Sequence, residues 1–236
     1  MANAIVVGAS SGIGRAIALD LAERGWTVGV AARRTALLSE LAAAHPNIGP
    51  SASIDVTDVQ AAVPALERMI AEMGGVRMVV LSSGVGEANR ALALDEELRT
   101  LDVNVRGFTA MANVAFHAMR EGGTLVGLSS VAGVRPSGGV PMYSASKAFA
   151  SNYMEGLALK AARDGSKLVV LDVRPGFVRT AMMKAPNPFW IASPERAARQ
   201  IVDAAVNGRS GALYVTKRWR LVAWALKALP NRWGGF

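Results

Sequence analysis

Short apolar runs rich in β-branched residues alternate with longer, alanine-rich stretches along nearly the whole chain. The apolar runs are expected to be strands at Ala4–Gly8, Thr27–Ala32, Ser51–Ile54, Met78–Leu81, Thr124–Ser129, Lys167–Asp172 and Ala212–Thr216. The stretches between them are expected to be helices at Ile13–Arg24, Ala36–Ala44, Val59–Met73, Glu96–Arg120, Met142–Arg163 and Pro194–Val206. Nearly all-apolar strands that alternate with helices are typical of a parallel sheet covered on both faces. The pattern therefore predicts an α/β fold with a doubly wound parallel sheet.

Composition narrows the classes of function. The chain has no cysteine, which excludes disulfides and thiolate chemistry, and its two histidines, His45 and His117, lie far apart, so no metal site is expected. Neither a secretory signal nor an apolar run of about 20 residues is present, and a cytoplasmic location is predicted. The net charge of +8 indicates an anionic partner. Because no nucleic-acid-binding motif accompanies it, nucleic acid is not expected.

A glycine-rich turn joins the first predicted strand to the first predicted helix. It reads Gly8-Ala9-Ser10-Ser11-Gly12-Ile13-Gly14. Glycine at these positions permits a tight turn and lets backbone N–H groups approach a pyrophosphate, which the helix N-terminus also attracts. No Gly-Lys-Ser/Thr follows, so this is not an ATP-binding loop. The turn predicts a dinucleotide site; the alternative is a glycine-rich turn without a ligand.

The end of the second predicted strand indicates which dinucleotide. Sites for NAD place an acid there to hold the ribose 2′-hydroxyl, whereas this strand ends in two alanines followed by Arg33 and Arg34. A guanidinium suits a 2′-phosphate through charge-assisted hydrogen bonds, so NADP is predicted in preference to NAD. The two arginines could instead be solvated. Asp55-Val56, after the third strand, could bind the adenine, or Asp55 could cap the next helix.

Three residues carry a candidate reaction. Tyr143 and Lys147 are spaced i, i+4 and share one face of a helix, and Ser130 ends the fifth strand thirteen residues earlier. A phenol has a pKa of about 10, which a nearby ammonium lowers toward the range needed for proton exchange. The Ser130 hydroxyl could hold a substrate oxygen while Tyr143 exchanges a proton with it.

These motifs together resemble the short-chain dehydrogenase/reductase family in its short, single-domain form. The resemblance runs from residue 4 to about residue 216. It rests on the glycine turn, the Asp55 motif, Asn104, Ser129-Ser130 and Tyr143–Lys147, and on Pro175-Gly176 with Thr180. It implies a Rossmann-type sheet of seven strands in the order 3-2-1-4-5-6-7.

The resemblance also implies residue roles. Ser130 would position a carbonyl, Tyr143 would be the general acid/base, and Lys147 would lower its pKa and bind the nicotinamide ribose. Asn104 would hold a water in the proton relay; it could also bond the backbone inside its helix. The loop containing Pro175, Gly176 and Val178 would seat the nicotinamide, with Thr180 near its carboxamide.

One segment departs from the family pattern. Leu81-Ser82-Ser83-Gly84 stands where the family has Asn-Asn-Ala-Gly. Gly84 still permits close backbone approach to the adenine ribose. Ser82 offers a hydroxyl in place of an amide, which puts sheet contacts and cofactor affinity in doubt.

The expected substrate pocket is apolar. Its candidate walls are Val131, Val134, Met142, Phe177, Met182 and Met183, with Phe189 and Trp190 further along the chain. The short segment Ala181–Ser193, which contains Pro186 and Pro188, is expected to be a small lid. These residues predict a hydrophobic ketone, aldehyde or secondary alcohol; the alternative is that they belong to the core or an interface.

The tail, residues 217–236, is predicted to be a basic amphipathic helix that follows a catalytic domain of residues 1–216. Its broad apolar surface must be buried, either on the same chain, on a sister subunit of a homodimer or homotetramer, or in a membrane interface. The leading interpretation is an oxidoreductase. An idle NADP-binding sensor or scaffold, or an epimerase or dehydratase on the same fold, are the alternatives.

Overall fold

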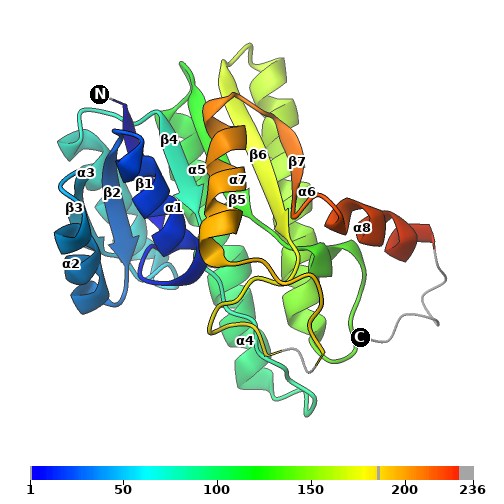
Figure 1. The fold of residues 1–236 in the computed structure, drawn as a ribbon. Helices are drawn as coiled ribbons and strands as arrows, with labels where there is room; N and C mark the ends of the chain where they lie inside the picture. Colours follow the sequence, from blue (N-terminus) through cyan, green and yellow to red (C-terminus); the bar gives the residue numbers. More distant parts are fainter. Residues whose placement is uncertain (1, 185–186, 229–236) are drawn as a thin grey trace.

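The computed structural model of the chain describes residues 2–184 and 187–228, and these form one α/β unit around a seven-stranded sheet (Figure 1). Every strand pair is parallel, and the order is β3-β2-β1-β4-β5-β6-β7. The strands are β1 Asn3–Val7, β2 Thr27–Ala32, β3 Ile48–Ser53, β4 Met78–Leu81, β5 Gly123–Leu128, β6 Leu168–Pro175 and β7 Gly211–Val215. The predicted doubly wound sheet and its strand order are therefore confirmed.

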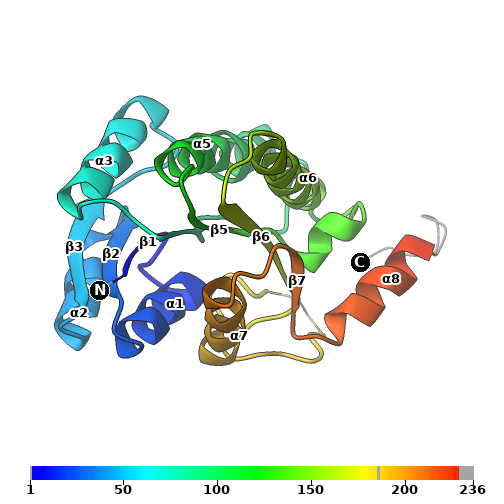
Figure 2. The same ribbon diagram turned by 90° about the horizontal axis from the view of Figure 1, so that it is seen from above.

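Helices cover both faces of the sheet (Figure 2). One face carries α1 Gly12–Glu23, α2 Thr35–Ala44 and α7 Pro194–Val206, and the other carries α3 Val59–Glu72, α5 Phe108–Ala118 and α6 Pro141–Arg163. Two further helices are α4 Leu94–Leu101 and α8 Trp219–Ala228, and α8 stands beside β7, at the edge of the fold. No helix in these described ranges is long and apolar enough to cross a membrane.

Two apolar cores follow from the alternation of side chains along each strand. Ile5 and Val7 of β1 point into the core on the α3, α5 and α6 side, whereas Val6 points into the core with α1 and α7. All three are fully buried. Burying one such side chain stabilises a fold by about 1.5–3 kcal/mol. The near-continuous apolar strands of the sequence are therefore explained by burial on both faces.

The predicted helix Glu96–Arg120 is wrong in one respect, because it is interrupted. A π-helical turn, η1 Asp102–Gly107, separates α4 from α5. Gly107 ends this turn where the chain passes very close to the loop after β3: a Cβ there would lie 2.6 Å from the Val56 carbonyl oxygen. The periodicity of the sequence is helical throughout and does not reveal the wider turn.

Two strand limits differ from those predicted by more than one residue. β3 begins at Ile48 rather than at the predicted Ser51, so it includes Gly49 and Pro50. It is the edge strand of the sheet, where proline's missing N–H is tolerated. β6 extends to Pro175 because it pairs with β7 up to Val215. This extension places Pro175 and Gly176 at the carboxyl edge of the sheet, where ligands bind in folds of this kind.

Candidate active site

The glycine turn after β1 is packed so closely that only glycine fits. Gly8 has φ of +91°, and a Cβ on it would lie 2.5 Å from the backbone nitrogen of Ser83. A Cβ on Gly14 would lie 2.3 Å from the Gly8 carbonyl oxygen. Helix α1 begins at Gly12 and continues with Ile13. A Cβ on Gly12 would lie 3.2 Å from the Cγ2 atom of Thr180, so this end of the helix adjoins Thr180. The turn thus offers the backbone N–H groups and helix end that a pyrophosphate needs.

The altered segment Leu81–Gly84 fits this packing. The Ser82 N–H donates to the Val7 carbonyl at 2.8 Å and so continues the contact between β4 and β1. Its hydroxyl lies 3.0 Å from the point where Gly14 would carry a Cβ. A small side chain is therefore suited to this position, and the backbone contact between β4 and β1 is kept.

Arg34 lies over the hydroxyls of the glycine turn. Its guanidinium donates to Ser10 Oγ at 2.8 Å through Nη2 and at 3.2 Å through Nε, and to Ser11 Oγ at 2.7 Å. Arg33 is exposed, with its Nη1 3.9 Å from Asp55 Oδ2. Arg34, Ser10 and Ser11 thus form a cationic, hydrogen-bonding cluster at the carboxyl ends of β1 and β2, and Arg33 adjoins Arg34 in the chain.

Asp55 does not cap α3, so that alternative is wrong. The cap is Asp58, which accepts from the Ala61 N–H at 3.2 Å. Asp55 instead accepts from the N–H and the hydroxyl of Thr57, at 3.0 and 2.8 Å. Val56 is buried and packs on Gly107.

A pocket of about 330 Å³ opens next to this cluster. Arg33, Thr57, Val85 and Val103 are among its lining residues. It therefore lies beside the loops that follow β2, β3 and β4. The pocket thus lies at the carboxyl edge of the sheet, where ligands bind in folds of this kind.

Ser130, Tyr143 and Lys147 meet beyond the end of β5. Ser130 caps the short helix η2 Val131–Val134 by accepting from the Ala132 N–H, and its hydroxyl lies close enough to Tyr143 to lower the pKa of that phenol. Tyr143 stands in the first turn of α6, and Lys147 one turn later. Lys147 Nζ lies 5.8 Å from the centre of the Tyr143 ring and donates to the Leu128 carbonyl at 3.0 Å. The predicted triad is therefore brought together.

Burial controls the ionisation of this group. Burial raises the pKa of Tyr143, and the hydrogen bond from Ser130 lowers it in part. Burial lowers the pKa of Lys147 to about 8, and the negative charge of Asp172 raises it. The expectation that Lys147 holds the pKa of Tyr143 below its ordinary value is not met in this structure, because burial disfavours the charged forms of both groups.

Asn104 ties the loop after β4 to α6. In the π-helical turn its side chain accepts from the Val85 N–H at 2.9 Å and donates to the Val85 carbonyl at 2.8 Å. It also donates to Ser146 Oγ at 3.0 Å. A Cβ on Gly84 would lie 3.4 Å from both Asn104 Oδ1 and Lys147 Nζ, so the three residues adjoin. Both amide hydrogens are used, and Oδ1 keeps one lone pair for a further donor.

Sequence reasoning missed two features next to the triad. Gly86 lies against Tyr143: a Cβ there would be 2.6 Å from the ring carbon Cε2. Asp172, on β6, is 4% exposed, bonds the Ser129 hydroxyl, and forms an ion pair with Arg174 at 2.6 Å. The sequence signals Asp172 only as a charged residue within an otherwise apolar strand. A carboxylate buried in such a strand requires partners, and this requirement could have drawn attention to it.

An aromatic cluster lies beside the Pro175-Gly176 loop. The Phe177 ring centre is 5.7 Å from that of Phe189 and 5.4 Å from that of Trp219, and Trp190 lies 6.1 Å from Trp219. Trp219 belongs to α8 and was not predicted to be near the pocket. It lies flat against Gly176, where a Cβ would be 1.9 Å from its Cε2 atom. The buried indole N–H of Trp219 has no partner among the described residues.

The other predicted pocket residues vary in exposure. Val131 is buried, Val134, Met142 and Met183 are half-buried, and Met182 is 43% exposed. The base of the predicted lid is fastened by Val178 and Ala192, which form a parallel bridge. Pro186 falls outside the described residues, as do residues 229–236 of the tail.

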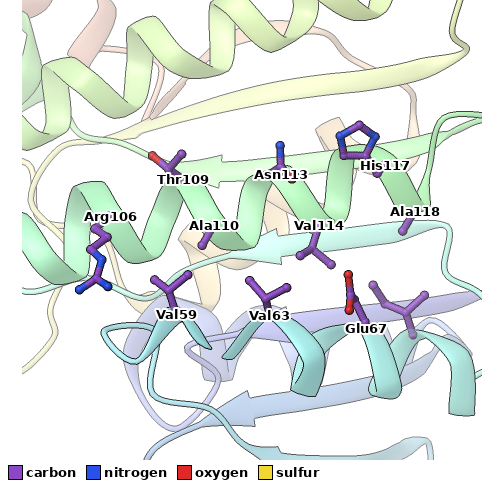
Figure 3. A pocket seen from close by; sticks show the side chains of 11 residues that line it. Val59, Val63, Glu67, Arg106, Thr109, Ala110, Asn113, Val114, His117 and Ala118 are labelled. Atoms are coloured by element: carbon purple, nitrogen blue, oxygen red, sulfur yellow. The ribbon is translucent and has the colours of Figure 1, made fainter. Parts of the chain in front are cut away.

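A larger pocket, of about 720 Å³, lies away from this site (Figure 3). It is a groove between α3 and α5, where Val59 and Val63 face Ala110 and Val114. Ser130, Tyr143 and Lys147 do not line it. Size alone is therefore a poor guide to the reactive part of this molecule.

Comparison with known proteins agrees with the geometry. The sequence model of the family described as short chain dehydrogenase matches residues 2–189. An uncharacterized oxidoreductase of Myxococcus xanthus is 41% identical over 79% of this chain and 77% of its own length. The 3-oxoacyl-[acyl-carrier-protein] reductase of Escherichia coli is 33% identical over 77% of this chain and 75% of its own.

Among solved structures, that of ElxO with NADP bound is similar in fold. The TM-score is 0.81, with 18% identity over 91% of this chain and 96% of that one. At this identity the likeness supports the fold alone. The family match, the two relatives and the strand order have one explanation: the chain belongs to the short-chain dehydrogenase/reductase family, whose members are oxidoreductases that use a nicotinamide cofactor.

Proposed function

We propose that this protein is an NADP(H)-dependent reductase or dehydrogenase that acts on a hydrophobic ketone, aldehyde or secondary alcohol, with Tyr143 as general acid/base. The observation that carries the proposal is the meeting of Ser130, Tyr143 and Lys147 beyond the end of β5, with Lys147 Nζ 5.8 Å from the centre of the Tyr143 ring. An idle NADP-binding sensor, the main alternative, has no need of a tyrosine, serine and lysine in this arrangement.

The cofactor site begins at the glycine turn. Its backbone N–H groups and the N-terminus of α1 would hold the pyrophosphate. Asp55 and the pocket beside Val85 would take the adenosine, with Ser83 and Gly84 along the ribose. The loop of Pro175, Gly176 and Val178 would seat the nicotinamide, with Thr180 beside the carboxamide.

The preference for NADP rests on the cationic cluster. Arg34 already bonds Ser10 and Ser11, so its guanidinium is positioned rather than freely mobile. A 2′-phosphate can accept charge-assisted bonds from Arg34 and Arg33 and from both hydroxyls. No acid stands at the end of β2 to bind a free 2′-hydroxyl; Asp55, on the next loop, is 3.9 Å from Arg33.

Bound nicotinamide would supply or accept the hydride at the carbonyl carbon. The chain's own residues manage the proton: in reduction, Tyr143 Oη gives its proton to the carbonyl oxygen, and in oxidation the phenolate takes it from the alcohol. Ser130 Oγ holds the same oxygen. Lys147, fixed by the Leu128 carbonyl, would bind the ribose hydroxyls, and its ammonium would oppose the rise that burial causes in the pKa of Tyr143. Asn104 would hold a water that carries protons onward.

The substrate class follows from the apolar walls. Val131, Val134 and Met142 lie near Ser130 and Tyr143 along the chain, and Phe177 belongs to the aromatic cluster. Met182 and Met183 would adapt to different shapes. The buried indole N–H of Trp219, which has no partner within residues 2–184 and 187–228, would offer one donor to an otherwise apolar wall.

The first prediction concerns cofactor preference. We expect NADPH to be preferred to NADH. Replacing Arg34 by Ala, or Arg33 by Ala, should raise the KM for NADPH by about ten- to a hundredfold, because each loses charge-assisted bonds worth about 1.5–3 kcal/mol. The KM for NADH should change little. Arg163→Ala, an exposed arginine at the end of α6, is the control. A wild-type preference for NADH would refute the assignment.

The second prediction separates chemistry from binding. A screen of aliphatic and aromatic ketones, aldehydes and alcohols, followed by nicotinamide absorbance, should yield a substrate. With it, Tyr143→Phe should lower kcat by about 10²–10⁴-fold, because the proton donor is lost. NADPH affinity, measured by calorimetry, should stay near the wild-type value. Undiminished turnover in this variant would contradict the role of Tyr143 as general acid/base.

The third prediction concerns pH. Lys147 has a pKa of about 8, so activity should fall as the pH rises past that value and the ammonium is lost. The Asp172 carboxylate raises the pKa of Lys147, so Asp172→Asn should move this alkaline fall to lower pH. Asp164→Asn, which removes an exposed partner of Lys160 at the end of α6, should leave the profile unchanged.

Asp172 acts here as a positioning residue, and its loss also leaves Arg174 without its ion-pair partner. Some loss of thermal stability is expected, because a buried charge is left unpaired. The readout is therefore the pH at half-maximal activity of the folded variant, not its yield. An alkaline limb that stays in place or moves to higher pH would contradict the role assigned to Asp172.

A further inference from the structure

Helix α8 has an outer face that nothing in the described structure covers. Trp219 and Ala223 are buried on the inner side, whereas Leu221 is 68% and Trp224 73% exposed. The exposed apolar residues recur at helical spacing and share one face: Leu221, Trp224, Ala225 and Ala228. We call these four residues the outer face of α8. Large apolar side chains that gather on one exposed face are typical of a surface that binds a protein or a membrane.

Basic residues flank the outer face along one edge. At 3.6 residues per turn, Arg220 and Lys227 fall together along this edge, and both are exposed. No aspartate or glutamate occurs in the sequence after Asp203. An apolar stripe with a cationic edge is complementary to a surface that is apolar inside and anionic outside.

The inner side of α8 is firmly attached to the catalytic unit. Trp219 packs on Gly176 and stacks with Phe189 at 5.0 Å between ring centres. Arg135, which follows η2, donates to the Leu226 carbonyl at 3.2 Å near the C-terminus of the helix, where a cation is favourable. Figures 1 and 2 show α8 standing beside β7, at the margin of the molecule. The outer face is thus presented by an anchored helix.

A second copy of the chain would be a poor occupant. Two outer faces brought together would set Arg220 and Lys227 of one helix near the same cations of the other. Like charges opposed across an interface are unfavourable, and no acid on α8 offsets them. An anionic bilayer avoids this repulsion, because its headgroups neutralise the cations. Its acyl chains also accept Leu221 and Trp224.

We propose that the outer face of α8 binds the surface of an anionic lipid bilayer, with the helix lying in the plane of the headgroups. The docking itself does not depend on the proposed function. Combined with that function, it sets the substrate class. Because Trp219 joins the same helix to the nicotinamide loop, the enzyme works at a bilayer surface on lipophilic carbonyls or alcohols dissolved there.

The test is sedimentation of the full-length protein with vesicles. One set contains phosphatidylcholine alone, and the other contains phosphatidylcholine with phosphatidylglycerol. The wild type should pellet with the second set at low salt and much less with the first. The variant Leu221→Ser/Trp224→Ser should lose at least about tenfold in binding, because burial of one such side chain is worth about that factor. Arg220→Gln/Lys227→Gln should lose the preference for anionic vesicles.

Leu159→Ser is the matched control, because Leu159 is also a leucine exposed on a helix, at 63%, but lies on α6. It should bind vesicles like the wild type. Light scattering without lipid identifies the competing occupant: if Leu221→Ser/Trp224→Ser turns an oligomer into a monomer, the face joins subunits and the proposal fails. Failure of the wild type to bind anionic vesicles overturns it too. Because sedimentation needs no turnover, neither result depends on the proposed reaction.

Discussion

The side chain of Asn104 is the contact on which the geometry of the candidate site depends. It bonds both backbone groups of Val85, in the loop after β4, and the hydroxyl of Ser146 on α6. Gly84 and Gly86, on either side of Val85, then lie against Lys147 and Tyr143 so closely that side chains there would collide or crowd. One amide thus sets the distance between the loop that borders the cofactor site and the helix that carries the tyrosine and lysine.

The same edge of the sheet is closed from the other side by the C-terminal segment. The backbone of Gly176 accepts no side chain because the indole of Trp219 occupies that space. Trp219 in turn contacts Phe177, Phe189 and Trp190 from the segment that follows β6. A helix beyond the last strand thus packs on the loop that follows β6. In the function that we propose, its inner side borders the substrate pocket, and in the docking that we propose, its outer side meets the bilayer.

Much of the fold could be predicted because its signals are local. Strands buried on both faces must be apolar along their whole length, and the spacing of Tyr143 and Lys147 places them on one helix face. The glycine turn could be recognised because Gly8 and Gly14 meet backbone atoms that no side chain would clear. The meeting of Ser130 with Tyr143 followed from the family resemblance and from the strand order, not from local spacing.

The remainder depends on contacts between distant segments. The π-helical turn at Asp102–Gly107 arises where Gly107 meets Val56, and Pro50 is tolerated because β3 is an edge strand. The pKa of Tyr143 is set by burial, which no spacing encodes. The partners of Asp172 are only partly local: Arg174 is two residues away, but Ser129 lies on another part of the chain. Trp219 looked like one residue of a tail, and only its packing on Gly176 makes it part of the site.

In the reaction that we propose, the Tyr143 site moves a hydride between the nicotinamide and a carbonyl carbon. The direct measurement uses NADPH deuterated at the transferable position of C4 and a hydrophobic ketone, with mass spectrometry of the product alcohol. We expect one deuterium at the carbinol carbon of each product molecule. Oxidation of the labelled NADPH with no deuterium at that carbon, under either label position, would contradict it.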